Sequence, residues 1–166
     1  MRHLSHNILN AAGLALCVSA LLFAVLFMER HLGLAPCPLC VLDRMVIGVM
    51  ALIFLLALLH RPGKTGQRVY AGLNLTFGII GTALASRHIQ LQNLPASETP
   101  DCTPDLAYML ETWPLTEILS TVFNTSGECA EVVWTFLGMS IPQQTLLLFI
   151  VLCVVCLMIF KNQKTP

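Results

Sequence analysis

The sequence predicts an all-α membrane protein, a four-helix transmembrane bundle that forms a single integral membrane domain over residues 1–166. Hydrophobic residues make up 56% of the chain and charged residues only 11%, a composition too apolar for an ordinary soluble domain. Four apolar runs are long enough to span a bilayer, since a helix rises about 1.5 Å per residue across a hydrocarbon core of roughly 30 Å. A long polar segment separates the third run from the fourth and predicts a large second loop.

The predicted spans cover about residues 8–28, 41–59, 69–86 and 143–160, with loops on one side at about 29–40 and 87–142. The first run could instead be a signal peptide. However, Asn10 interrupts it, no A-x-A cleavage pattern follows, and the pair Glu29 and Arg30 is a poor cleavage flank. We therefore predict that it spans the membrane. The fourth run reaches spanning length when it begins by Gln143.

The basic residues predict the orientation of the bundle. Six of the nine lie on one side, and the other side carries three basic residues and all nine acidic residues; the six are Arg2, Arg61, Lys64, Arg68, Lys161 and Lys164. By the positive-inside rule, both termini are cytoplasmic and the two loops face outward. The four apolar runs make the lipid bilayer an expected partner. Nucleic acid is not expected, because no basic stripe is interleaved with aromatic residues.

A pair of closely spaced cysteines lies where the second span begins. Cys37 and Cys40 are separated by Pro38 and Leu39, and Arg44 follows one helical turn beyond Cys40. Two sulfur atoms at this spacing can form a local disulfide, and a helix N-terminus together with Arg44 stabilises a thiolate. The motif predicts a redox-active dithiol at the membrane rim. A structural zinc half-site or a pair of buried cysteines are the alternatives.

Placing the charged Arg44 inside a span is unfavourable in free energy unless it has a partner or a function. The neighbouring Asp43 points elsewhere on a helix and is not an ideal partner. We therefore predict that Arg44 binds a carbonyl group of a lipid-soluble ligand, the alternative being that it reaches out to lipid headgroups. Arg87 and His88, at the outer end of the third span, either assist this site or anchor the span at the interface.

Two further cysteines, Cys102 and Cys129, fall in the long outward loop. Four outward cysteines allow three pairings, and pairing Cys37 with Cys40 and Cys102 with Cys129 closes the shortest loops. A Cys102–Cys129 disulfide would either staple the loop or exchange with another thiol. Exchange is favoured beside a second dithiol on the same membrane face, because two disulfides within reach can trade partners.

The span cysteines have a different predicted role. Cys153 and Cys156 share the CxxC spacing, but they and Cys17 lie within apolar spans that disfavour a thiolate. We predict that these three small side chains pack between helices. With no acidic cage and no glycine-rich phosphate loop, the sequence predicts no metal site and no nucleotide site.

The loop between Cys102 and Cys129 contains apolar residues at helical spacing over 106–122, broken or kinked at Pro114. This pattern predicts a short interfacial helix on the outer leaflet. The alternative is a small packed cap over the helix ends, and the two are compatible.

Taken together, these motifs resemble the disulfide bond formation protein B (DsbB) family of bacterial inner-membrane thiol oxidases. The resemblance covers nearly the whole chain and rests on residues 36–40 with Arg44, residues 126–131, Trp134, and residues 136–138 and 141–143. It implies a protein of the bacterial inner membrane whose active cysteines are periplasmic. Such a protein reoxidises a DsbA-like periplasmic thiol oxidase and passes the electrons to the membrane quinone pool, as ubiquinone or menaquinone.

The resemblance also implies residue roles. Cys102 forms the mixed disulfide with the partner, Cys129 exchanges with Cys37, and Cys40 is the thiolate that meets the quinone. Arg44 stabilises that thiolate and binds the quinone. Some members have a histidine a few residues beyond the arginine of the third span, whereas here His88 follows the arginine directly, so no histidine role is carried over.

Three other functions remain compatible with the sequence. A paralogue could serve a dedicated partner, such as an arylsulfate-sulfotransferase-associated oxidase. A heavy-metal-binding or transport protein could use the same cysteines, because soft metals favour thiolates. A scaffold could carry both disulfides as inert staples.

Overall fold

The computed structural model describes residues 6–34, 36–94, 111–114, 116–117, 132 and 134–161. Its helices are α1 (His6–Leu22), which continues as the π-helix η1 (Phe23–His31), then α2 (Pro38–His60), α3 (Lys64–Gln92) and α6 (Ile141–Lys161). Two short strands, β1 (Thr135–Phe136) and β2 (Met139–Ser140), precede α6. In this described part of the chain, four helices are long and apolar enough to cross a membrane, which confirms the predicted bundle.

The helices extend beyond the apolar runs that predicted them. The third span, predicted over 69–86, is a helix of 29 residues from Lys64 to Gln92, because its polar ends are helical too. The second begins at Pro38 rather than at residue 41. Proline is favoured at the first helical position because it has no backbone N–H that would need a hydrogen-bond partner there. This shift places Cys40 within the first turn of α2.

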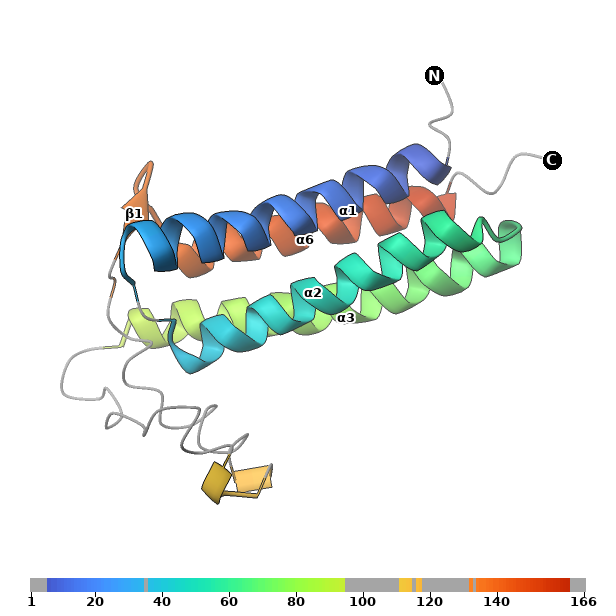
Figure 1. The fold of residues 1–166 in the computed structure, drawn as a ribbon. Coiled ribbons are helices and arrows are strands. Elements are labelled where there is room, and N and C mark those ends of the chain that lie inside the picture. Colours follow the sequence, from blue (N-terminus) through green and yellow to red (C-terminus); the bar gives the residue numbers. More distant parts are fainter. Residues whose placement is uncertain are drawn as a thin grey trace.

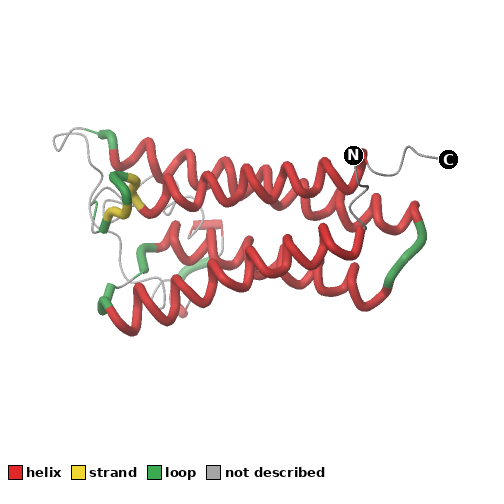
Figure 2. The backbone as a smooth tube through the Cα atoms, turned by 90° about the horizontal axis from the view of Figure 1, so that it is seen from above, coloured by secondary structure: helices red, strands yellow, loops and turns green. Residues whose placement is uncertain are grey.

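The four helices run alongside one another in a single bundle (Figures 1 and 2). The most extensive contacts join α3 to α6, α1 to α2, and α2 to α3. The start of α1, the end of α6 and the α2–α3 connection lie at one end of the bundle. The start of α2, the end of α3 and the β-hairpin lie at the other. The described basic residues near the first end are Arg61, Lys64, Arg68 and Lys161.

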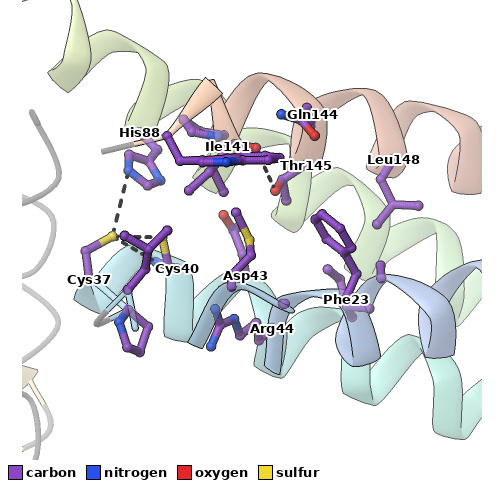
Figure 3. A pocket seen from close by; sticks show the side chains of 18 of the residues that line it. Phe23, Cys37, Cys40, Asp43, Arg44, His88, Ile141, Gln144, Thr145 and Leu148 are labelled. Carbon is purple, nitrogen blue, oxygen red and sulfur yellow. Dashed lines mark hydrogen bonds between the residues drawn. The ribbon is translucent and has the colours of Figure 1, made fainter. Parts of the chain in front are cut away.

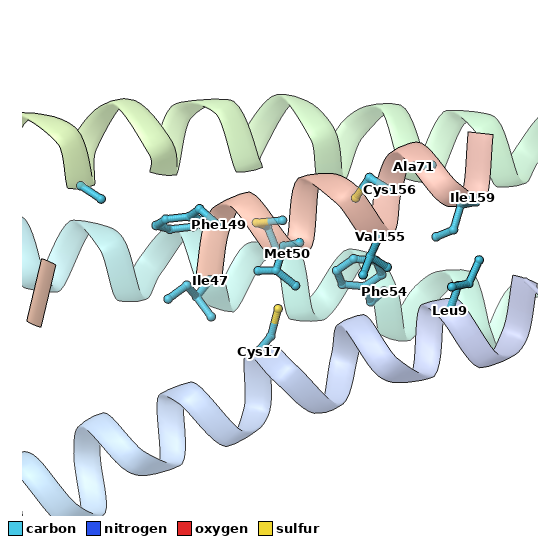
Figure 4. Close-up of a cluster of buried hydrophobic side chains, with 12 residues drawn as sticks. Leu9, Cys17, Ile47, Met50, Phe54, Ala71, Phe149, Val155, Cys156 and Ile159 are labelled. Carbon is cyan, nitrogen blue, oxygen red and sulfur yellow. The ribbon is translucent and has the colours of Figure 1, made fainter. Parts of the chain in front are cut away.

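The core of the bundle is held by close helix contacts (Figure 4). Phe54 of α2 and Phe149 of α6 are fully buried there. A Cβ atom on Gly13 would lie 2.6 Å from the Phe54 ring, and one on Gly81 would overlap atoms of the Phe149 ring. Small residues that let aromatic rings approach a neighbouring backbone are typical of membrane helices, where packing replaces the hydrophobic effect as the cohesive force.

Large apolar side chains cover the outside of the bundle. Leu59 is 72% exposed, Met45 61% and Ile79 60%, exposures that would be unfavourable in water but suit contact with acyl chains. Inside the bundle, the buried side chains of Asn10 and Gln67 satisfy each other through a 2.9 Å hydrogen bond that ties α1 to α3. The polarity pattern is therefore that of a membrane domain.

The β-hairpin lies at the end of the bundle where α2 begins and α3 ends. Thr135 pairs with Ser140 and Phe136 with Met139. The two connecting residues, Leu137 and Gly138, both have positive φ (54° and 78°), as a type I′ turn requires. The Gln143 side chain accepts a hydrogen bond from the Ser140 backbone N–H at 2.9 Å, which is half of a capping box at the start of α6.

The long loop is described only in part. Cys102, Cys129 and most of the predicted interfacial helix over 106–122 lie outside the described residues. Trp113, which is described, packs against a buried cluster formed by Leu39, Leu84 and Leu91, near the start of α2 and the end of α3. This contact supports the packed-cap alternative for its part of the loop.

Candidate functional site

Cys37 and Cys40 meet at the first turn of α2. Cys37 is the N-cap residue: its sulfur accepts a hydrogen bond from the Cys40 backbone N–H at 3.4 Å, and Pro38 occupies the first helical position. The Cys37 thiol donates to the Cys40 sulfur across 2.9 Å. Both sulfur atoms therefore sit at the positive end of a helix and within reach of a mutual disulfide.

His88 joins this pair from α3. Its side chain is only 3% exposed, and its Nε2 atom lies 3.8 Å from the Cys37 sulfur. The buried residues of α3 run through Gly81, Leu84, His88 and Leu91, which is the spacing of one helix face. His88 therefore belongs to the buried face of α3, and interfacial anchoring does not describe it.

Arg44 has a partner that the sequence did not indicate. Its guanidinium forms an ion pair with the carboxylate of Glu29, at the end of η1. Both side chains are partly exposed, at 21% and 29%, so the pair lies at the edge of the bundle. From the sequence, only Asp43 was weighed as a partner, whereas Glu29 comes from another helix 15 residues earlier in the chain.

A pocket of about 290 Å³ opens beside these residues. All the transmembrane helices contribute to its walls. Cys40, Asp43 and Arg44 line it from α2, and Figure 3 shows Gln144 and Thr145 across the pocket from them, with Phe23 and Leu148 further in. Small-molecule pockets typically have volumes of roughly 300–1,000 Å³, apolar walls and a few polar groups that orient the ligand. This pocket suits a flat, mostly apolar molecule with polar oxygens.

Asp43 also lines this pocket, together with Arg44, although the sequence suggested that its carboxylate pointed elsewhere on the helix. It is 4% exposed, and its Oδ1 atom has no hydrogen-bond partner among the described residues. An unsatisfied buried carboxylate oxygen is unfavourable. Asp43 is thus an available polar group facing the pocket.

An aromatic cluster borders the pocket on the side of η1. Phe23 and Phe27 stack at 5.0 Å between ring centroids, Phe27 stacks on His31 at 5.5 Å, and Trp134 stacks on Phe136 at 6.0 Å. Trp134 is also tilted against Phe23 at 6.1 Å and edge-on to Phe27 at 6.4 Å. Aromatic rings are enriched at membrane interfaces, and this cluster joins the hairpin to the first span beside the site.

The structure brings together three of the five predicted site residues. Cys37, Cys40 and Arg44 line one pocket, whereas Cys102 and Cys129 lie outside the described residues. The sequence left open whether His88 assists the site or anchors the span, and it did not indicate Glu29 as a partner of Arg44. The helical spacing of His88 from Gly81 and Leu84 was a usable signal for its burial. No sequence spacing links Glu29 to Arg44.

The span cysteines lie in the core, away from the pocket. Cys17 and Cys156 are fully buried in the hydrophobic cluster. A Cβ on Gly78 would lie 2.6 Å from the Cys153 sulfur, so this side chain packs directly against the α3 backbone. These contacts agree with the predicted packing role.

Comparison with known proteins identifies the family. The family model described as "Disulfide bond formation protein DsbB" matches residues 6–159. Disulfide bond formation protein B of Stutzerimonas stutzeri (strain A1501) is 49% identical over 140 residues, covering 84% of this chain and 86% of the relative. The protein of the same name from Psychrobacter sp. (strain PRwf-1) is 40% identical over 159 residues, covering 95% and 93%. The chain therefore belongs to the DsbB family of disulfide bond formation proteins.

Proposed function

We propose that this protein is a protein-dithiol:quinone oxidoreductase that reoxidises a DsbA-like periplasmic thiol oxidase and reduces membrane quinone. Its family makes it a membrane oxidoreductase of disulfide formation. The observation that carries the finer proposal is the Cys37–Cys40 pair, which sits at the edge of an apolar pocket also lined by Arg44. A dithiol placed there can pass electrons to a ligand held among the helices.

The electron path begins with thiol–disulfide exchange. A thiolate of the reduced partner attacks the Cys102 sulfur of a Cys102–Cys129 disulfide, and the second partner thiol resolves the mixed disulfide, leaving the partner oxidised. The Cys129 thiolate then attacks Cys37 in a Cys37–Cys40 disulfide and releases Cys40 as a thiolate. Attack by Cys102 on the Cys37–Cys129 bond restores the loop disulfide. The electron pair and two protons now reside on Cys37 and Cys40.

In the last step, the Cys37–Cys40 dithiol becomes a disulfide and its two electrons and two protons go to the quinone, which supplies the oxidising power. Both cysteines line the pocket, and we assign the contact with the substrate to Cys40, as the resemblance to the family implies. Arg44 offers guanidinium N–H donors for a quinone oxygen. Glu29 offsets the charge of Arg44 and so makes an arginine at this depth tolerable.

The residues present fit a quinone. The pocket walls include Phe23, Ile47 and Leu148 on three helical segments, which suits a flat ring with an apolar tail. Polar groups sit toward the end that carries the cysteines, as Figure 3 shows for Cys40, Asp43 and His88. This polarity gradient would orient the ring toward Cys40 and the tail toward the bilayer. Both ubiquinone and menaquinone match this chemistry.

We place the protein in the bacterial inner membrane with both termini cytoplasmic and the cysteines of the site periplasmic. The Lys and Arg distribution supports this orientation. The cysteine pair lies at the end of the bundle opposite the α1 start and the α6 end. Disulfides persist in the periplasm, so this orientation puts the dithiol in a compartment where it can act.

The proposal is tested by following quinone reduction by absorbance in detergent-purified protein, with a reduced thioredoxin-like partner as electron donor. We expect turnover that disappears in Cys102→Ser and in Cys40→Ser. Cys153→Ser is the matched control, since this cysteine has the same CxxC spacing but lies among the helices, and it should keep its turnover. A folded protein that reduces neither ubiquinone nor menaquinone analogues would contradict the proposal.

A further inference from the structure

We propose that Cys37, Cys40 and His88 form a binding site for a thiophilic divalent cation of the Zn²⁺ class, and that the site exists only while the cysteine pair is reduced. The sequence predicted no metal site, because the three residues come together only through the packing of α2 against α3. The binding site itself stands on the geometry below. Its consequence for turnover rests on the function proposed above.

The geometry of the three ligand atoms is close to that of a zinc site. The two sulfur atoms and the imidazole nitrogen all lie within 4.8 Å of one another. Zn–S bonds of about 2.3 Å and Zn–N bonds of about 2.0 Å in a tetrahedron separate ligand atoms by roughly 3.5–3.8 Å. Cys37 Sγ and His88 Nε2 are 3.8 Å apart, while the two sulfur atoms, at 2.9 Å, must separate by less than 1 Å. Rotation of one cysteine side chain supplies that movement.

The donor set and its surroundings also favour such a cation. Two thiolates and one imidazole are preferred zinc ligands, and they select against hard cations such as Mg²⁺. His88 is buried on α3, so its ring is held in place, whereas Cys37 and Cys40 are half-buried and accessible to an entering ion. The helices thus present the ligands with little freedom left to lose on binding.

The fourth coordination position would face the pocket. Asp43 lies one turn along α2 from Cys40, on the pocket side, and its Oδ1 accepts no hydrogen bond from any described residue. Because no oxygen of this carboxylate lies within 4.8 Å of all three ligand atoms, a water molecule would complete the tetrahedron. The open side is therefore on the surface where the quinone is proposed to bind, so cation and quinone would compete for the same sulfur.

Binding is gated by the redox state of the pair. When both cysteines are thiols, the cation replaces two protons and the sulfurs bind as thiolates, with no change in oxidation state. A Cys37–Cys40 disulfide has no thiolate to offer, and the site disappears. A bound cation would hold the pair reduced, blocking both exchange at Cys37 and electron transfer from Cys40.

The site can be tested with Co²⁺ as a spectroscopic probe. Full-length protein carrying Cys102→Ser and Cys129→Ser, which keeps only the pocket pair outside the core, is reduced, freed of reductant and titrated in detergent under argon. We expect one Co²⁺ per chain, with sulfur-to-cobalt charge-transfer absorption and the visible bands of a tetrahedral ion. Zn²⁺ should displace it, and the oxidised protein should give no such spectrum.

Variants at the histidine decide whether His88 is a ligand. His88→Ala should weaken Co²⁺ binding at least about 10- to 100-fold, the range found even for outer-shell partners of metal ligands. His88→Cys, which supplies another soft ligand, should restore a tetrahedral spectrum. His60→Ala is the matched control, because His60 lies at the opposite end of α2 beside Tyr70. Unchanged affinity in folded His88→Ala, or binding to the oxidised protein, would overturn the proposal.

A separate measurement links the site to turnover. Zn²⁺ added to the wild-type protein during quinone reduction should inhibit it, and excess chelator should restore the rate. Tetrahedral Co²⁺ binding in a protein without quinone turnover would support the site and contradict the proposed function. Turnover that proceeds without any Co²⁺ binding would contradict the proposed site and support the proposed function.

Discussion

The imidazole of His88 lies 3.8 Å from the sulfur of Cys37, the cysteine that caps α2. In the proposed electron path, Cys37 is the sulfur attacked during exchange, whereas Cys40 faces the quinone. Cys37, Cys40 and His88 all line the pocket, but His88 makes its 3.8 Å contact with Cys37, whereas Arg44 lies one helical turn beyond Cys40. This asymmetry predicts that mutation can separate the exchange step from the quinone step.

His88→Gln should slow exchange at Cys37 and leave the quinone step nearly unchanged. A glutamine fills similar space but cannot shuttle a proton, and we expect a loss of about 100-fold, the low end of general acid–base effects of roughly 10²–10⁴. Two rapid-mixing experiments separate the steps: oxidised protein with reduced partner, and reduced protein with quinone. Equal slowing of both would show that His88 does not act on the exchange step alone.

Arg44→Ala should raise the KM for quinone and leave exchange with the partner possible. Losing a hydrogen bond to a charged group costs about 1.5–3 kcal/mol, which corresponds to roughly 10- to 100-fold in affinity. Quinone titrations of the initial rate measure this. Arg61→Ala, at the other end of α2, is the control. Unchanged quinone kinetics in Arg44→Ala would return Arg44 to an anchoring role at the membrane surface.

Glu29→Gln tests the ion pair between Arg44 and Glu29 by removing the negative charge of Glu29. Removing the carboxylate leaves Arg44 without its counter-charge at the edge of the bundle. We expect a loss of stability of no more than about 1 kcal/mol, as for other solvent-accessible pairs, and a smaller change in the KM for quinone than Arg44→Ala causes. Thermal unfolding in detergent and the same titrations provide the two readouts. A larger KM effect than that of Arg44→Ala would mean that Glu29 itself contacts the substrate.

Gly81→Ala should destabilise the bundle because the new methyl group would overlap the ring of Phe149. Overpacking of this kind costs about 1–3 kcal/mol. Gly48→Ala is a matched change, since a Cβ there meets no atom of the described residues within 4 Å, and it should be neutral or slightly stabilising. Thermal or denaturant unfolding in one detergent compares them. Equal stability of the two variants would show that the α3–α6 contact can rearrange at little cost in free energy of unfolding.

Reporter fusions should confirm the orientation. Alkaline phosphatase, which is active only in an oxidising compartment, should be active when inserted in the 95–100 segment and inactive when fused after Lys161. The expectation follows from the cluster of basic residues at the end that holds Arg61, Lys64 and Lys161. An active fusion after Lys161 would reverse the topology and place the cysteine pair in the cytoplasm.

The sequence predicted those features that depend on neighbouring residues in the chain. Apolar run length identified the four spans, and the Cys37–Cys40 spacing beside a helix start identified the dithiol at the rim. The ends of α3 were underestimated because polar residues such as Lys64 and Gln92 extend a helix without any hydropathy signal.

Contacts between helices could not be predicted in the same way. The pairing of Arg44 with Glu29 and the approach of His88 to Cys37 depend on how η1, α2 and α3 rotate and cross. A single sequence contains no direct measure of those angles. The buried spacing on α3 gave a partial signal for His88, since it continues the face that contains Gly81 and Leu84.

The length of α3 makes bilayer thickness a variable in the chemistry. Its 29 residues extend about 43 Å, well beyond a hydrocarbon core of roughly 30 Å. The extra length must be accommodated by tilt or by projection of the helix ends into the headgroup layer. His88 lies in the part of α3 that extends beyond the predicted span. In the proposed orientation, Cys37 and His88 lie toward the periplasmic interface, while Phe23 and Leu148 lie deeper along the pocket. A thicker membrane would draw the thiols toward the dry layer, so lipid composition itself would tune how readily electrons enter the protein.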